Sequence, residues 1–110
     1  MFPPAVPSVE PAGVPAEARI LDVREPDEWE AGHIDGALHI PLAELPGRVG
    51  ELPDDENVVV VCRTGGRSGR ATAWLVQNGY DAVNLDGGMS AWAASGKPMV
   101  SETGDTPTVL

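Results

Sequence analysis

The fold is decided by Asn57-Val58-Val59-Val60-Val61-Cys62-Arg63-Thr64-Gly65-Gly66-Arg67-Ser68. Four consecutive valines indicate a strand buried on both faces, because β-branched side chains suit the interior of a covered sheet. Two adjacent glycines then allow a sharp turn, and a helical pattern opens at Ser68. The only cysteine of the chain, Cys62, therefore lies between the end of a strand and the start of a helix.

This position favours a thiolate at Cys62. Loop N–H groups and the positive end of the helix dipole face a group held there, and Arg63 and Arg67 add positive charge. A thiol with the ordinary pKa of about 8.5 is only about 3% ionised at pH 7, whereas a pKa about two units lower makes it mostly ionised. We expect a nucleophilic Cys62 with a lowered pKa and a sulfur reachable from solvent. The alternative is a buried, inert cysteine, the usual fate of a free thiol.

Strand and helix patterns alternate along the rest of the chain. Strands are expected at Arg19–Val23, Ala37–Ile40, Val58–Val61 and Ala82–Leu85, and helices after Glu25, around Leu45–Leu52, at Ser68–Asn78 and around Trp92. The alternation predicts an α/β fold with a mostly parallel central sheet of about four to five strands, flanked by helices on both faces. Ligands of such sheets bind outside the carboxyl ends of the strands, where Cys62 lies.

The chain of 110 residues is long enough for one domain with a modest core. Five of its eleven prolines fall in the first fifteen residues. We therefore expect a proline-rich segment at 1–18 with an edge strand near Val6–Val9, the domain itself at 19–100, and a flexible tail at 101–110.

The charge of the chain limits its partners. A net charge of −10, from 17 acidic and 7 basic residues, argues against nucleic acid and against an anionic membrane surface. No stretch has the roughly 18 apolar residues of a membrane-spanning helix, and the first residues lack the pattern of a signal peptide, so a cytoplasmic location is expected. Arg63, Arg67 and Arg70 surround Cys62 and suggest that the loop attracts a small anion; alternatively, they only pair with nearby carboxylates.

The motifs of the chain resemble those of single-domain rhodaneses, the rhodanese-like sulfurtransferases. The active loop of that family is similar to Cys62–Arg67 followed by the small hydroxylated Ser68. The family's other two signatures resemble Leu21–Arg24 with Glu28-Trp29 and Gly32–Ala37, and Leu85–Gly88 with Ala91-Trp92. The resemblance covers roughly Arg19 to Pro98. One departure is the proline-rich start, where the family often has a clearer first strand and helix.

The resemblance implies a ping-pong reaction in which the Cys62 thiolate takes the outer sulfur of a donor such as thiosulfate, forms a persulfide and passes the sulfur on. Cys62 would be the catalytic residue. The residues expected to bind the anionic donor are Arg63, Thr64, Gly65, Gly66, Arg67 and Ser68, with Asp22 and Arg24 supporting the site from the neighbouring strand or forming an ordinary ion pair. The acceptor would be cyanide, a thiol or a sulfur-accepting protein. We expect a monomer without a cofactor, and no metal site, because His33 and His39 have no second cysteine nearby.

Two other functions remain open. A carrier or regulatory module of the same family would hold a persulfide without turnover by itself. A cysteine phosphatase also uses a thiolate in an amide-lined loop, but it places its arginine six positions after the cysteine, where this chain has Ser68. A loop one residue shorter leaves less room for a phosphoryl group.

Overall fold

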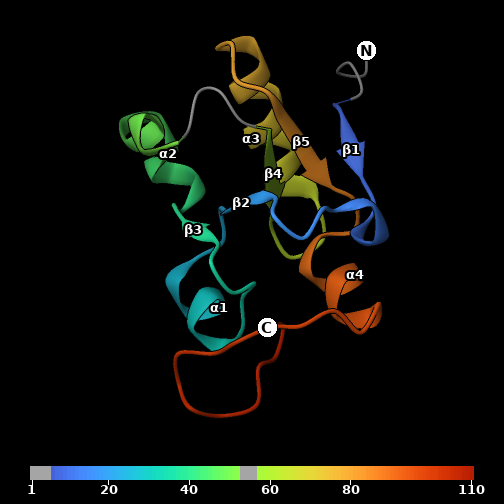
Figure 1. The fold of residues 1–110 in the computed structure, drawn as a ribbon. Coiled ribbons are helices and arrows are strands. Elements are labelled where there is room, and N and C mark those ends of the chain that lie inside the picture. Colours follow the sequence, from blue (N-terminus) through green and yellow to red (C-terminus); the bar gives the residue numbers. More distant parts are fainter. Residues whose placement is uncertain (1–5, 53–56) are drawn as a thin grey trace.

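The computed structural model describes residues 6–52 and 57–110. The prediction of an extended, proline-rich start falls partly on residues 1–5, which lie outside the described residues. From Ser8 onward the chain forms a sheet with helices packed against it (Figure 1).

Five parallel strands form the sheet, in the order β1-β5-β4-β2-β3. The four valines are β4 (Val58–Val61), which lies between β2 (Arg19–Asp22) and β5 (Ala82–Leu85). The edges are β1 (Ser8–Val9) and β3 (Leu38–His39), two residues each. The predicted α/β architecture is therefore confirmed.

In the described residues, three α-helices connect strands, namely α1 (Pro26–Ala31), α2 (Leu45–Arg48) and α3 (Gly66–Gln77), and α4 (Gly88–Ala94) follows the last strand. Single 3-10 turns lie at Pro11–Gly13, Leu42–Glu44 and Val49–Glu51. The helix expected around Leu45–Leu52 is thus only one α-helical turn between two 3-10 turns.

The start of α3 differs from the prediction. The helix begins at Gly66, two residues before Ser68, because Gly65 takes the left-handed conformation (φ +109°) and turns the chain at once. That conformation is costly for residues other than glycine. Gly66 itself has no positive φ. As a result, the N–H groups of the first helical turn lie next to Cys62.

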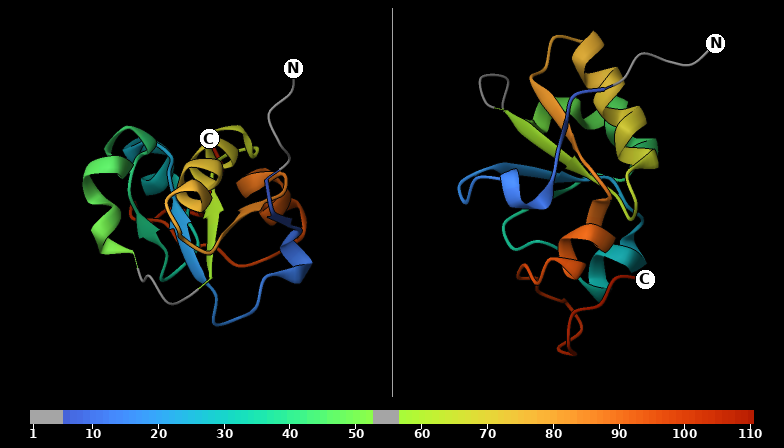
Figure 2. Two further views of the ribbon diagram at one scale, coloured as in Figure 1. Left: turned by 90° about the horizontal axis from the view of Figure 1, so that it is seen from above. Right: turned by 90° about the vertical axis from the view of Figure 1, so that its right-hand side faces the viewer.

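The sheet is covered on both faces because alternate side chains of a strand point to opposite sides. Val58 and Val60 pack in one apolar cluster with Leu45 and with Leu75 of α3. Val59 and Val61 belong to the other cluster, which contains Leu85, Met89 and Trp92. Figure 2 shows α2 and α3 on one side of the sheet and α4 on the other.

The last residues of the chain run along α1 (Figure 1). Val100 and His33 exchange backbone hydrogen bonds, and the N–H groups of Glu102 and Thr108 donate to the carbonyls of Glu30 and Ala31. A Cβ on Gly32 would come within 2.5 Å of the Thr108 carbonyl oxygen. These contacts show where the segment 101–110 lies, and its flexibility stays a prediction.

None of the helices that the structure describes has the length and apolar character needed to cross a membrane.

Candidate active site

The predicted site residues meet at the carboxyl edge of the sheet. In the parallel register Asp22 lies beside Val61, and Val60 lies beside Asn84. The chain leaves β2, β4 and β5 at this same edge. The cysteine loop therefore lies between the residues that follow β2 and the glycines that follow β5.

Hydrogen-bond donors point at the Cys62 sulfur from the start of α3. The Gly65 N–H donates to Sγ at 3.0 Å, and the Ser68 hydroxyl lies 3.2 Å from Sγ. Burial raises the pKa of the Cys62 thiol, but hydrogen bonds from the Ser68 hydroxyl and from the N–H groups of Ser68, Gly65 and Thr64 outweigh it and hold the pKa below its ordinary value. The expected direction of the pKa shift is therefore reproduced, and hydrogen bonds account for it.

The expected exposure of the sulfur is wrong in this structure. Cys62 is only 1% exposed and belongs to the apolar cluster with Val60 and Ala71. The Gly65 N–H and the Ser68 hydroxyl lie against Sγ, and the start of α4 packs against the backbone carbonyls of Cys62 and Arg63.

Gly88 makes the approach of α4 possible. The N–H groups of Met89 and Ser90 donate to the carbonyls of Cys62 and Arg63 at 2.8 and 2.9 Å. A Cβ on Gly88 would lie 2.4 Å from the Cys62 carbonyl oxygen, and its φ is +59°. The turn after β5, in which Gly87 and Gly88 both have a positive φ, therefore lies against the cysteine loop.

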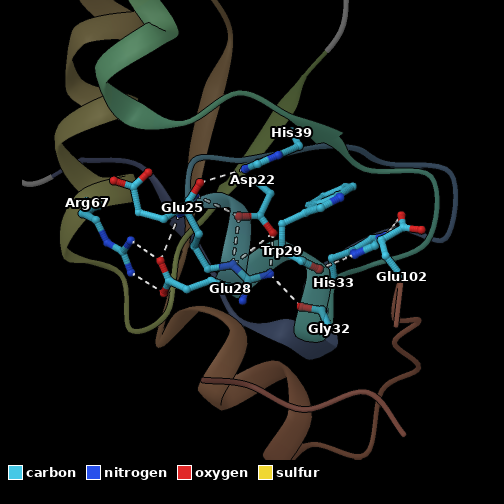
Figure 3. A network of polar contacts seen from close by, with 10 residues as sticks. Asp22, Glu25, Glu28, Trp29, Gly32, His33, His39, Arg67 and Glu102 are labelled. Carbon is cyan, nitrogen blue, oxygen red and sulfur yellow. Dashed lines mark hydrogen bonds and ion pairs between the residues drawn. The ribbon is translucent and has the colours of Figure 1, made fainter. Parts of the chain in front are cut away.

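Arg67 is held by a carboxylate that the sequence analysis did not assign to the site. Its guanidinium group donates to both oxygens of Glu28, at 2.7 and 2.9 Å (Figure 3). The hydrogen bonds from Arg67 outweigh burial and lower the pKa of Glu28 from 4.5 to about 2. The alternative in which a loop arginine pairs with a carboxylate is therefore observed for Arg67.

The other loop residues expected to bind an anion differ in exposure. Arg63, Thr64 and Gly66 are exposed, Gly65 is half-buried and Ser68 is fully buried. Within residues 6–52 and 57–110, no ion pair of Arg63 is found. Arg63 is thus the guanidinium group adjacent to Cys62 that is available to a ligand.

Asp22 and Arg24 form a buried ion pair with each other. Arg24 Nη2 donates to Asp22 Oδ2 at 2.7 Å and to the Gly32 carbonyl at 2.8 Å, and both side chains are buried. This pair ties the end of β2 to the end of α1. Any support that it gives to the cysteine loop is indirect, through α1 and its Glu28.

Trp29 holds α1 in place by ring stacking, which the sequence did not predict. Its ring stacks between His33 and His39, with ring centroids 3.6 and 4.7 Å away (Figure 3). The Nδ1 of His33 lies 2.7 Å from the Trp29 carbonyl oxygen. Trp29 is therefore half-buried in a stack rather than a member of either apolar cluster.

No part of the described chain brings together three or more His, Cys, Asp or Glu side chains that could hold a metal ion. A cavity of about 650 Å³ lies near Ile20 and Asn57, at the amino ends of β2 and β4. It is at the opposite end of these strands from Cys62, so the cavity and the reactive sulfur are separate features.

Sequence reasoning missed two residues of the site, Glu28 and Asn84. Glu28 was quoted as part of a motif that resembles a family signature, without a role in the site, and its partner is 39 positions away. Asn84 was predicted only to lie in a strand, but its side chain forms hydrogen bonds with the Ser68 hydroxyl and the Gly65 carbonyl. A polar residue at a buried strand position was the available signal, because such a side chain needs a hydrogen-bond partner.

Comparison with known proteins gives consistent results. The family model of the Rhodanese-like domain matches residues 12–95. A protein named sulfurtransferase from Allochromatium vinosum is 45% identical over 86 residues, which cover 77% of this chain and 80% of the relative. The protein YqhL of Bacillus subtilis is 46% identical over 77 residues, 69% of this chain and 61% of the relative. The crystal structure of a rhodanese-related protein from Thermoplasma volcanium aligns with a TM-score of 0.82 at 34% identity and covers 86% of this chain and 97% of that one.

Proposed function

Because this chain belongs to the rhodanese-like domain family, we propose that it is a sulfurtransferase that moves sulfane sulfur from an anionic donor such as thiosulfate to a thiophilic acceptor through a persulfide on Cys62. The observation that carries the proposal is the set of donors around one sulfur, with the Gly65 N–H at 3.0 Å and the Ser68 hydroxyl at 3.2 Å. Such donors stabilise an anionic sulfur in the way that an oxyanion hole stabilises oxygen.

In the first half-reaction the Cys62 thiolate attacks the outer sulfur of thiosulfate. A new S–S bond forms to Sγ, the S–S bond of thiosulfate breaks, and its electron pair leaves with sulfite. No proton is transferred, and the enzyme keeps one negative charge, now on the terminal sulfur of the persulfide. The loop N–H groups would bind that charge.

In the second half-reaction an acceptor such as cyanide attacks the terminal sulfur. Thiocyanate forms, the persulfide bond breaks, and its electron pair returns to Sγ as thiolate.

Two arginines would act on the donor in the first half-reaction. The exposed Arg63 would hold the sulfonate end of the donor, since a guanidinium group binds tetrahedral oxyanions. Arg67 would orient the loop through Glu28 and contribute to donor binding by its positive charge.

The burial of Cys62 adds a requirement to this scheme. With the residue 1% exposed, the outer sulfur of a donor reaches Sγ only if the loop 63–66 moves. The exposed positions of Arg63, Thr64 and Gly66 make this the side from which a donor would enter.

The test is incubation of the reduced protein with thiosulfate and cyanide. Thiocyanate and sulfite should form in equal amounts, and Cys62→Ser should abolish both. Without cyanide, mass spectrometry should find one additional sulfur atom on Cys62. Absence of thiocyanate together with absence of that sulfur would contradict the proposal, and phosphate release from an aryl phosphate that depends on Cys62 would favour a phosphatase.

The second candidate is a persulfide carrier that is loaded by another protein, and the burial of Cys62 favours it. A partner that opens the loop would supply the movement that a small donor has to induce. Turnover with thiosulfate alone distinguishes the two: persulfide that forms only from a protein donor would identify a carrier.

A further inference from the structure

Asn84 connects β5 to the cysteine loop through two hydrogen bonds. Its Nδ2 donates to the Gly65 carbonyl oxygen at 3.2 Å, and its Oδ1 accepts from the Ser68 hydroxyl at 2.6 Å. Asn84 is 8% exposed and Ser68 is fully buried. Since a carbonyl only accepts, the bond to Gly65 fixes which end of the amide faces Ser68.

Ser68 has one hydroxyl proton and two groups that can accept it. They are Asn84 Oδ1 at 2.6 Å and Cys62 Sγ at 3.2 Å. When Cys62 is a neutral thiol, its S–H can donate to Ser68 Oγ while Ser68 donates to Asn84, and every group is satisfied. When Cys62 is a thiolate, Ser68 can donate to Sγ only by releasing Asn84 Oδ1, which then stays buried without a partner. An unsatisfied buried acceptor is unfavourable.

We propose that Asn84 is a positioning residue that competes with the Cys62 sulfur for the Ser68 proton and so limits how much of the thiol is ionised. The inference deepens the proposed function, because it concerns how much of the nucleophile Cys62 is ionised. It rests on the proposed function only in that Cys62 is taken to be the nucleophile of sulfur transfer. Once Sγ carries a second sulfur, Ser68 can return its proton to Asn84. The pair would thus alternate with the state of the cysteine.

The charged groups around the sulfur are the same in the uncharged variants, Asn84→Leu and Ser68→Ala. Arg67 of α3 carries its charge near Cys62 and is paired with Glu28 of α1, and Arg63 extends from the loop. From α4, the N–H groups of Met89 and Ser90 donate to the loop, and neither is charged. An uncharged substitution of Asn84 therefore changes hydrogen bonding alone.

The test is the pH dependence of Cys62 alkylation by iodoacetamide. Asn84→Leu removes the competing acceptor at similar size, so Ser68 donates fully to the thiolate. We expect the midpoint of the rate profile to fall by about half to one pH unit, that is, about three to ten times more thiolate at a pH below both midpoints. A role of Asn84 in loop structure alone predicts the opposite sign, because a loosened loop loses the donors that lower the midpoint.

The Ser68→Ala background provides the matched control. Ser68→Ala should raise the midpoint, and adding Asn84→Leu should then change nothing, because the two residues act through one proton. A rise of the midpoint in the single Asn84→Leu variant, or an equal change with and without Ser68, would overturn the inference.

A second substitution covers the case in which Asn84→Leu does not fold. Asn84→Asp keeps the acceptor for Ser68 and adds a negative charge, so it should raise the midpoint more in the presence of Ser68 than in the Ser68→Ala background. Equal rises would show an effect of charge alone and refute the proton competition. Alkylation needs no sulfur donor, so this result is independent of whether thiocyanate is formed.

Discussion

Replacing Glu28 by Gln tests whether the ion pair with Arg67 holds the cysteine loop to α1. The amide oxygen of Gln can still accept the hydrogen bond that the Glu25 N–H now donates to Glu28 Oε1 at 3.0 Å. The cap of α1 is therefore kept, and the change removes the charge from one side of the pair.

The magnitude follows from the lowered pKa of Glu28. A shift from 4.5 to about 2 corresponds to at most about 3 kcal/mol. The Arg67 side chain is 30% exposed and that of Glu28 14%, so solvent screening reduces the contribution to about 1–2 kcal/mol. We expect Glu28→Gln to lower the free energy of unfolding by this amount at pH 7.

The loss should depend on pH in a defined window. A carboxyl group with a lower pKa in the folded state stabilises the protein above its unfolded pKa, and the stabilisation disappears as the pH falls through the folded value. With these values at 4.5 and about 2, about three quarters of the effect remains at pH 4 and about two fifths at pH 3. The variant and the original protein should thus converge as the pH falls below 4.5.

Urea unfolding followed by tryptophan fluorescence measures this difference at each pH. Glu51→Gln is the matched control, because Glu51 pairs with Arg48 on the surface and surface pairs contribute little. A loss at pH 3 as large as at pH 7, or a loss no greater than that of Glu51→Gln, would refute the reasoning.

Three other predictions concern the same loop. Gly88→Ala should lower the free energy of unfolding by at least about 2 kcal/mol, because its Cβ would lie 2.4 Å from the Cys62 carbonyl oxygen. The control is Gly79→Ala, which also has a positive φ but no atom within 4 Å of the added Cβ, and it should cost only about 1 kcal/mol. Thermal unfolding measures both losses, and similar losses would contradict the close approach of Gly88 to Cys62. Because the pKa of Cys62 is lowered, its alkylation rate should reach half its maximum below pH 8.5, which is about the pKa of a free thiol. A midpoint at or above that pH would show that the hydrogen-bond donors around Sγ do not stabilise the thiolate. Arg63→Ala should raise the KM for thiosulfate about fivefold, equivalent to about 1 kcal/mol, with unchanged stability, while Arg70→Ala should leave the KM unchanged; equal effects would show that only the general positive field matters.

The strands could be predicted because their sequences have one reasonable interpretation. Val58–Val61 and Ala82–Leu85 have the same bounds in the sequence pattern and in the structure. An uninterrupted β-branched run needs cover on both faces, and a parallel sheet provides it. The segment Leu45–Leu52 was harder, because apolar spacing favoured a helix while Pro46 and Gly47 opposed it, and the result is one helical turn between two 3-10 turns.

The partners within the site could not be predicted, because they depend on contacts between distant elements. Arg67 and Glu28 are 39 positions apart, and Ser68 and Asn84 are 16 apart. The sequence shows which charges and hydroxyls are present, but the sheet order decides which of them meet. For the three arginines around Cys62 the sequence therefore left open attraction of an anion or pairing with carboxylates, and the structure shows the pairing for Arg67 with Glu28.

The wrong expectation at Cys62 has a physical cause that also bears on the mechanism. Thiolate stabilisation and exposure were expected together, yet hydrogen bonds act only at contact distance. A sulfur that accepts from the Gly65 N–H and the Ser68 hydroxyl must be enclosed by the loop that carries them. The structure accordingly combines a lowered pKa with 1% exposure. If the loop 63–66 opens to admit a donor, it must release the hydrogen bond from the Gly65 N–H. Losing that donor makes each thiolate more nucleophilic but raises the pKa, so a smaller fraction of Cys62 is ionised at the moment when the sulfur becomes reachable.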